Sequence, residues 1–213
     1  MEKTLQQQRY DLMGAKLVKN LTARRFKAIY VQTKEEAKEA ALGFMKEGSS
    51  VSWGGSLTMK EIGLDEEIRK RNYRLIDRAK AKDKEEARKI MKEALTADYF
   101  IASANAISIE GEIFEIDGAA NRISSIIFGA GEVIIIAGMN KVCPSLEEAE
   151  ARAQNIAGPL NAIRLKKNTP CALNGNCSEC ISPDCICAVK AVIRLSMVPE
   201  RIKVILVGED LGL

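Results

Sequence analysis

Short apolar segments alternate with helix-forming segments along most of this chain of 213 residues. The apolar segments are rich in β-branched and aromatic residues and are predicted to be strands: 26–31, 51–53, 73–76, 99–102 and 132–138. The segments between them are predicted to be helices: 33–46, one running through Glu61 and Leu64 to Arg71, and 83–95. Strands that alternate with helices predict an α/β fold, with a mostly parallel sheet covered by helices on both faces.

Further segments are expected to add to this sheet. Residues 2–25 are predicted to form an N-terminal helix with an apolar stripe of Leu5, Leu12, Leu17, Val18 and Leu21. Segments 107–109 and 113–116 predict an antiparallel hairpin about Glu110, and segments 188–195 and 201–207 predict another through Pro199. Ser145 is expected to cap a helix that ends at about Ile156, ahead of Gly158-Pro159. We therefore expect a single α/β domain over 1–213, with an N-terminal helix at 1–25 and a Cys-rich loop at 168–188.

The chain contains no histidine, which removes Ser-His-Asp and Cys-His chemistry and any His-ligated metal. Acid–base chemistry would have to use carboxylates, Lys, Cys or Tyr. The net charge is only +3, and Lys and Glu are interleaved in 34–39 and 82–86, so nucleic acid is not an expected partner. The N-terminus lacks an apolar leader and the apolar run at 133–139 is too short for a bilayer, so we expect a cytoplasmic protein without a membrane partner.

The segment from Cys171 to Cys187 holds five of the six cysteines and reads C-A-L-N-G-N-C-S-E-C-I-S-P-D-C-I-C. In a reducing compartment, thiols gathered this closely favour a metal over a disulfide. The Cys177-x-x-Cys180 pair can place two sulfurs on one ion, and Cys171 and Cys187 complete a set of four ligands. A structural zinc and a [4Fe-4S] iron–sulfur cluster both fit this ligand count, and reduced thiols or a disulfide remain the alternatives.

The segment Gly54-Gly55-Ser56-Leu57-Thr58 lies where a predicted strand runs into a helix. Its glycines allow close backbone approach, and the hydroxyls of Ser56 and Thr58 suit an anion, although a tight βα turn explains the same residues. Ligands of open α/β sheets usually bind at the carboxyl ends of the strands. We therefore predict a small-anion site there, with further contacts from Asn105, Asn121, Arg122 and Lys141.

These motifs together resemble the lactate-utilisation (LUD) domain family over nearly the whole chain. The resemblance rests on Gly54–Thr58 with Glu61-Ile62-Gly63-Leu64, on Asn105 through Arg122, on Gly138-Met139-Asn140-Lys141-Val142, on Ala151-Arg152 and on Pro159-Leu160-Asn161. Its later part holds Thr169-Pro170-Cys171, Cys177-Ser178-Glu179-Cys180, Ser182-Pro183, Cys187 and Gly208-Glu209-Asp210-Leu211-Gly212. Cys185 departs from the pattern, because relatives with these cysteines have a basic residue there.

The resemblance implies a fold similar to ribose-phosphate isomerases, glucosamine-phosphate deaminases and CoA transferases, and a role in lactate or organic-acid metabolism. Because the family is linked to redox systems, the resemblance favours an iron–sulfur cluster over zinc, although the repeated cysteine pattern of two-cluster ferredoxins is absent. The implied ligand is a small anionic metabolite: an organic acid, a sugar phosphate or a CoA ester. If the protein is an enzyme, Glu61, Glu110 and Asp117 are the predicted catalytic carboxylates. The alternatives are a non-catalytic accessory that docks a redox partner protein, and an isomerase or CoA transferase.

Overall fold

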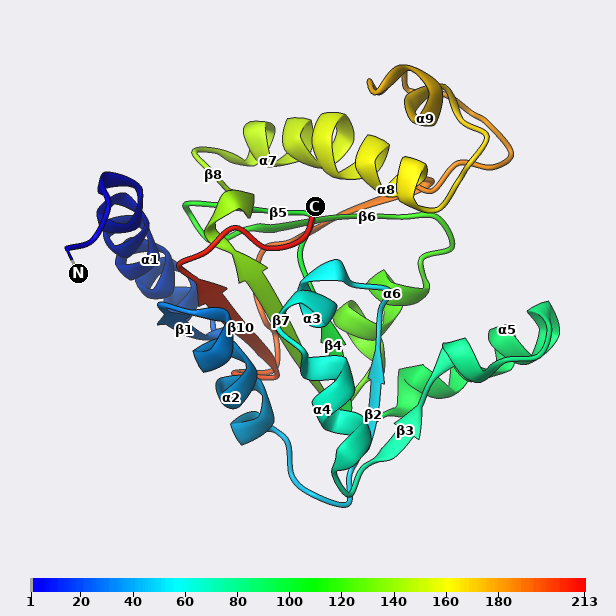
Figure 1. Ribbon diagram of the computed structural model, residues 1–213, viewed down its shortest axis with the longest axis horizontal. Coiled ribbons are helices and arrows are strands. Elements are labelled where there is room, and N and C mark those ends of the chain that lie inside the picture. Colours follow the sequence, from blue (N-terminus) through cyan, green and yellow to red (C-terminus); the bar gives the residue numbers. More distant parts are fainter. Residues whose placement is uncertain (1) are drawn as a thin grey trace.

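A six-stranded parallel sheet forms the centre of the computed structural model, which describes residues 2–213 (Figure 1). In spatial order its strands are β1 (Lys27–Val31), β10 (Ile202–Val207), β7 (Glu132–Gly138), β4 (Tyr99–Ala102), β2 (Ser50–Trp53) and β3 (Arg74–Ile76). Strands β7 and β10 are buried along nearly their whole length, as expected of the centre of a parallel sheet. The predicted α/β fold with a mostly parallel sheet is confirmed.

Helices and a second, smaller sheet cover the two faces of this sheet. One face packs against α2 (Lys34–Phe44), α3 (Leu57–Glu61) and α4 (Leu64–Lys70), through strand residues such as Ile134 and Ile136. The other face packs against α1 (Leu5–Ala23), η2 (Ala94–Thr96), η3 (Ser125–Gly129) and the smaller sheet, through residues such as Val133 and Ile135. Because side chains alternate along a strand, neighbouring residues of β7 thus supply two separate cores.

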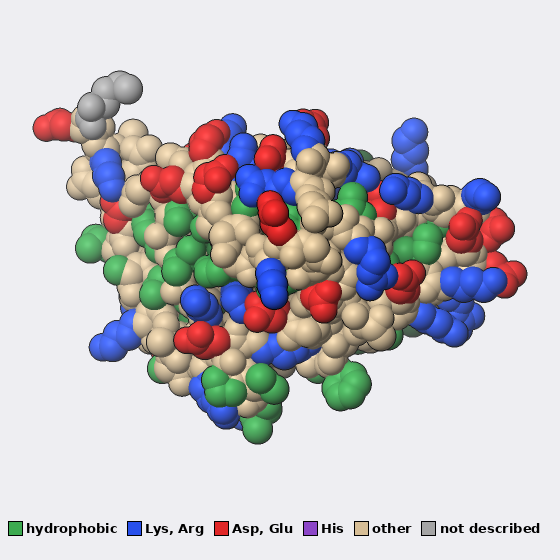
Figure 2. All heavy atoms as spheres, turned by 90° about the horizontal axis from the view of Figure 1, so that it is seen from below, with side chains coloured by type: hydrophobic (Ala, Val, Ile, Leu, Met, Phe, Trp, Pro, Cys, Tyr) green, Lys and Arg blue, Asp and Glu red, His purple; other side chains and the backbone are tan. Residues whose placement is uncertain are grey.

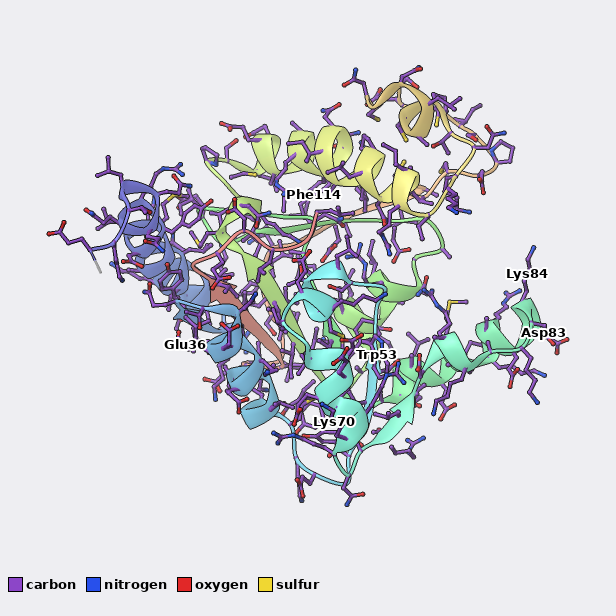
Figure 3. The ribbon with its side chains drawn as sticks, in the orientation of Figure 1. Glu36, Trp53, Lys70, Asp83, Lys84 and Phe114 are labelled. Atoms are coloured by element: carbon purple, nitrogen blue, oxygen red, sulfur yellow. The ribbon has the colours of Figure 1, made fainter. Side chains whose placement is uncertain are left out.

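The smaller sheet has the order β8 (Val142–Cys143), β5 (Ala106–Ser108), β6 (Ile113–Asp117) and β9 (Val189–Ile193). Strands β5 and β6 are antiparallel, which confirms the predicted hairpin about Glu110. The outer face of this sheet is covered by one helical rod made of α7 (Leu146–Arg152), η5 (Ala153–Ala157) and α8 (Gly158–Arg164). Figure 3 shows Phe114 of β6 beneath this rod.

The remaining elements are short connections. They are η1 (Arg78–Lys80), α5 (Lys84–Glu93), α6 (Asn121–Ser124), η4 (Met139–Lys141) and α9 (Pro170–Asn174). Asp83 and Lys84 lie at the far end of α5, which projects from the body of the protein (Figures 1 and 3). Figure 2 shows a face on which acidic and basic side chains are interspersed. Among the described residues, no helix combines the length and apolar character needed to cross a membrane.

One predicted strand pairing and one predicted helix end are wrong. The strands on either side of Pro199 do not form a hairpin: β9 pairs antiparallel with β6, whereas β10 lies parallel between β1 and β7. The helix that begins after Ser145 does not stop before Gly158-Pro159 but continues to Arg164. Its central turn is a π-helix, and a widened turn accommodates a proline that lacks the donor of a regular helix.

The predicted apolar stripe of α1 is only partly right. Leu17 and Leu21 are buried, but Leu5 and Leu12 are 84% and 76% exposed. The inward face instead continues through Gly14 and Tyr10. Gly14 is needed there because a Cβ atom would lie 2.5 Å from Cδ2 of Tyr30 on β1.

Candidate functional site

The loops that follow β2, β4 and β7 meet at one edge of the parallel sheet and, with α8, enclose a cavity of about 180 Å³. This is the edge where ligands of open α/β sheets usually bind. Every residue predicted to bind the ligand lines this cavity: Gly54, Gly55, Ser56, Thr58, Asn105, Asn121, Arg122 and Lys141. The cavity also exposes Asn161 of the Pro159-Leu160-Asn161 motif, and polar residues that the sequence motifs do not single out: Arg78, Ser103 and Arg164.

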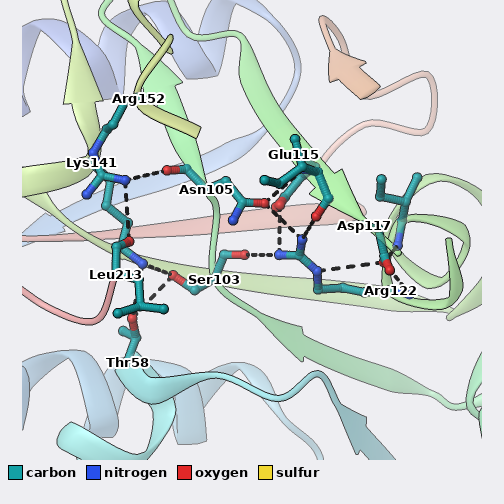
Figure 4. A network of polar contacts seen from close by, with 11 residues as sticks. Thr58, Ser103, Asn105, Glu115, Asp117, Arg122, Lys141, Arg152 and Leu213 are labelled. Carbon is teal, nitrogen blue, oxygen red and sulfur yellow. Dashed lines mark hydrogen bonds and ion pairs between the residues drawn. The ribbon is translucent and has the colours of Figure 1, made fainter. Parts of the chain in front are cut away.

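Arg122 lines the cavity and contacts both the loop after β4 and strand β6 (Figure 4). Its Nη1 atom donates to the backbone oxygen of Ser103 at 3.2 Å and lies 2.7 Å from Oε2 of Glu115. Its Nη2 atom donates to Oδ1 of Asn105 at 2.9 Å and to the backbone oxygen of Ile116 at 2.6 Å. The guanidinium group therefore joins β6 to the loop after β4, and its Nη hydrogens are engaged by protein atoms rather than free for a ligand.

Glu115 is a fully buried carboxylate next to this guanidinium group. Its contact with Arg122 has the distance of an ion pair but not the geometry of a hydrogen bond, and neither oxygen accepts a hydrogen bond within the described residues. Burial raises the pKa of Glu115 to about 7, against the opposing effects of Arg122 and Lys141. This carboxyl group thus changes its charge near neutral pH, directly behind the wall of the cavity.

Lys141 lies at the base of the cavity, at the end of η4, with 3% of its surface exposed. Its Nζ atom donates to Oγ of Ser103 at 2.9 Å and to Oγ1 of Thr58 at 3.3 Å (Figure 4). Burial, reinforced by the positive charge of Arg152, lowers the pKa of Lys141 to about 8. The site therefore combines an amine that can lose its proton with two hydroxyl groups in hydrogen-bond contact.

The three predicted catalytic carboxylates are not brought together. Asp117 lines the cavity, but its oxygens accept from the backbone nitrogens of Ala119, Arg122 and Ile123, so it also caps the start of α6. Glu61 is exposed and accepts from the backbone nitrogen of Gly212 at 2.7 Å. Glu110 lies in the β5–β6 turn beside Lys16, 3.0 Å from its Nζ atom, and is absent from the cavity lining.

Two glycines of the 54–58 loop have different surroundings. A Cβ atom on Gly54 would lie 3.2 Å from Cδ of Arg122, a tight contact that Arg122 would have to shift to relieve. A Cβ atom on Gly55 would lie 3.7 Å from Nη2 of Arg78, an ordinary contact. Ser56 caps α3 by accepting from the backbone nitrogen of Met59. Part of this loop is therefore explained by packing and capping, and Arg78 extends over it toward the cavity.

Cys171, Cys177, Cys180, Cys185 and Cys187 line a second cavity of about 210 Å³ between the Cys-rich loop and α8. Burial and the neighbouring thiols raise the pKa of Cys187 to about 11, because clustered thiolates repel one another. The thiols surround the cavity without converging: across residues 2–213 no three His, Cys, Asp or Glu side chains are grouped so that they could hold a metal ion. Cys143 lies elsewhere, buried under α7.

Comparison with known proteins identifies the family. The model of the LUD domain family matches residues 14–207. A DUF162 family protein from Deinococcus radiodurans has a similar solved structure, with a TM-score of 0.54 and 11% identity, over 93% of this chain and 98% of that one. Two weaker likenesses each cover 54% of this chain. Ribose 5-phosphate isomerase A of Methanocaldococcus jannaschii has a TM-score of 0.36 and 18% identity, over 56% of that chain. The eIF2B beta of Chaetomium thermophilum has a TM-score of 0.40 and 17% identity, over 44% of that chain. No curated protein matches the sequence.

Proposed function

Because this chain belongs to the LUD domain family, which supports a role related to lactate utilisation, we propose that it binds a small organic acid in the cavity at the ends of β2, β4 and β7. The family assignment predicted from the sequence motifs is confirmed by the match over 14–207. The ligand is proposed to be a 2-hydroxy or 2-oxo carboxylate, of the size of lactate or pyruvate.

One observation carries the proposal: three cations converge on the cavity without a counter-ion from the protein. Arg78, Lys141 and Arg164 all line it, and within residues 2–213 none of them has a carboxylate oxygen within 4.0 Å. Cations left unpaired around a concave site attract an anionic ligand, and guanidinium groups suit a carboxylate in particular. The cavity of about 180 Å³ is smaller than the usual pocket of a drug-sized ligand, which favours a small acid over a whole CoA ester.

The roles of the predicted residues follow from their partners. Arg78 and Arg164 are proposed to hold the carboxylate, because both Nη atoms of Arg122 are already engaged. Arg164 donates to Asn161 through Nε and Nη2, and Arg78 to Met91 through Nη1, so within residues 2–213 each keeps one Nη atom without a protein acceptor. Asn121 and the 54–58 loop complete the wall around the ligand. Asp117 is the only predicted catalytic carboxylate at the cavity among the described residues, so it is the one whose contact with a ligand is worth testing first.

Isothermal titration with lactate, pyruvate, ribose 5-phosphate and acetyl-CoA tests this proposal. We expect binding of lactate or pyruvate, and at least a tenfold weaker affinity in Arg78→Gln and Arg164→Gln, since a charge-assisted hydrogen bond contributes about 1.5–3 kcal/mol. Arg88→Gln is the matched control, because Arg88 is exposed on α5 and does not line the cavity. Binding of the sugar phosphate or the CoA ester alone would favour an isomerase or a CoA transferase, and no binding of any of the four would contradict the site.

We also propose that the Cys-rich loop holds a [4Fe-4S] cluster, or alternatively zinc, on Cys171, Cys177, Cys180 and Cys187. The thiols share one cavity, and a bound cation would relieve the repulsion among their thiolates. Because they do not converge in a metal-binding arrangement, the loop would have to draw inward around the group. Cys185 lines the same cavity and could replace one of the four ligands.

Metal and acid-labile sulfide analysis of protein purified without oxygen tests this second proposal. Iron with sulfide is expected, and Cys180→Ser is expected to remove most of it, whereas Cys143→Ser, outside the loop, should not. Stoichiometric zinc would make the loop a structural site. A reducible cluster in a protein that binds none of the small ligands would favour the electron-transfer or assembly accessory that docks a redox partner. Metal content unaffected by Cys180→Ser would contradict the four-cysteine assignment.

A further inference from the structure

Lys141 differs from the other buried lysine of this protein in its partners. Lys203, 7% exposed, forms an ion pair with Glu132 at 2.5 Å across neighbouring strands, as a structural lysine should. Lys141 is 3% exposed and, within residues 2–213, has no carboxylate oxygen within 4.0 Å. Because a buried charge without a counter-ion is costly, its position at the base of a cavity requires an explanation beyond packing.

The position of Lys141 is fixed by the tight turn at the end of β7. A Cβ atom on Gly138 would lie 2.6 Å from both the oxygen of Glu209 and the nitrogen of Leu211, so only glycine permits this approach. Oδ1 of Asn140 accepts from the backbone nitrogen of Leu211 at 3.1 Å, and Nε of Arg152 donates to the oxygen of Asn140 at 3.0 Å. The backbone from which Lys141 extends is therefore held in one place, and the hydrogen bonds of Nζ to Ser103 and Thr58 hold the amine, as a reacting group requires.

The atoms around Nζ suit a nucleophilic amine. The hydroxyl groups of Ser103 and Thr58, at 2.9 and 3.3 Å, can take a proton from the amine and pass one to an oxygen bound beside it. A lysine that is desolvated or lies near another cation is activated as a nucleophile toward carbonyl groups. Arg152 is such a cation, and burial together with the charge of Arg152 lowers the pKa of Lys141 to about 8.

We propose that Lys141 forms an imine with the C2 carbonyl group of a 2-oxo acid bound in the cavity. The neutral amine adds to C2, so that a C–N bond forms while the oxygen takes up the proton that nitrogen releases. The nitrogen lone pair then expels this oxygen as water, with one further proton from solvent, and leaves a protonated imine on Lys141. No oxidant or reductant is consumed.

This inference rests on the proposed function, because Arg78 and Arg164 must hold the carboxylate of the acid. The two arginines and Lys141 line the same cavity, so carboxylate binding and attack at the adjacent carbon are compatible. An imine would acidify C3 of the bound acid, which makes proton exchange at that carbon the reaction to look for. Lys141 would then be the nucleophile, in place of the carboxylate that CoA-transferase-like chemistry requires.

Borohydride reduction in the presence of pyruvate, followed by intact and peptide mass spectrometry, tests the proposal. We expect a gain equal to pyruvic acid less one oxygen atom, located on Lys141. Lys141→Arg keeps the positive charge but cannot form an imine, so it should lose at least nine-tenths of the adduct and still bind pyruvate by titration. Lys203→Arg should form the adduct as the unchanged protein does. Peptide mapping of the unchanged protein gives the answer even where a variant fails to fold.

The outcomes separate the two proposals. Pyruvate that binds without leaving an adduct on Lys141 would overturn the imine but leave the anion site standing. An adduct that is spread over exposed lysines, and that Lys141→Arg does not diminish, would also overturn the imine on Lys141 and leave the anion site standing. Failure of pyruvate and every other tested acid to bind would overturn both.

Discussion

Glu115 places an ionisable carboxyl group in a fully buried position beside Arg122 and behind the cavity wall. Burial raises its pKa from 4.5 to about 7. Between these two pH values the folded protein therefore holds a proton on Glu115 that the unfolded chain has already lost. Stability rises with pH where the unfolded state binds more protons, and here the folded state binds more. The contribution of Glu115 to the free energy of unfolding is therefore highest below its unfolded pKa and falls as pH rises toward 7.

We expect wild type to lose on the order of 3 kcal/mol through this group between about pH 4.5 and 7, since one pKa unit corresponds to about 1.4 kcal/mol. Glu115→Gln cannot titrate and should lack this component. Urea unfolding of both proteins across that pH range measures the difference. In wild type Lys141, with its pKa lowered to about 8, stays largely charged in this window, and Glu115→Gln/Lys141→Arg serves as a control because the charge of Glu115 raises the pKa of Lys141. Parallel stability curves for the two proteins would contradict the raised pKa.

Arg122 shows why a single residue is a weak guide to binding. Its sequence context, among Asn, Asp and Gly, predicts a ligand contact, and it does line the cavity. Its Nη donors, however, are taken up by Glu115, Asn105 and backbone oxygens. Within residues 2–213, Arg78 and Arg164 have the same chemistry without a carboxylate partner: Arg164 donates only to Oδ1 of Asn161, and Arg78 only to Sδ of Met91. Nothing in their sequence context distinguishes them. The partner atoms come from segments far apart in the sequence, so only the folded chain identifies which guanidinium groups are free.

At the scale of elements, local signals predicted helices and strands well and helix faces less well. The helix predicted to begin at Thr33 does begin there, with a capping box between Thr33 and Glu36, because all of the atoms of this signal lie within one turn. The strand 132–138 also forms as predicted, because a run of apolar residues suits a strand buried on both faces. The buried face of α1 could not be predicted from its leucines, since it depends on how closely Gly14 approaches Tyr30.

Leucines of α1 provide a direct test of this face. Leu17 is fully buried in the core that α1 shares with the parallel sheet, whereas Leu12 is 76% exposed. We expect Leu17→Ala to lower the free energy of unfolding by about 2–5 kcal/mol, because it leaves a cavity in the core. Leu12→Ala should change it by no more than about 0.5 kcal/mol. Urea unfolding of the two variants measures this, and equal losses would show that α1 packs differently.

At the scale of the whole molecule, the two cavities lie on opposite sides of one wall. Consecutive residues of β6 face different cavities, Asp117 toward the cations and Ile116 toward the thiols, because side chains alternate along a strand. In the helical rod, Ala157 lines the first cavity, and Gly158 and Pro159 line the second. Any group held by the Cys-rich loop would therefore lie close to the proposed acid-binding site.

The sequence by itself determined the fold class, most strands and helices, the family, and a set of polar residues that line one cavity. These depend on short-range patterns: apolar periodicity, capping residues and turn-forming glycines, which act within a few residues of one another. The tertiary structure alone decided that β10 enters the centre of the sheet, and that among residues 2–213 Lys141 has no counter-ion where Lys203 has one. It also decided that Arg122 is occupied by Glu115. Each of these depends on which distant segments meet, and burial and charge pairing there are properties of the assembled fold.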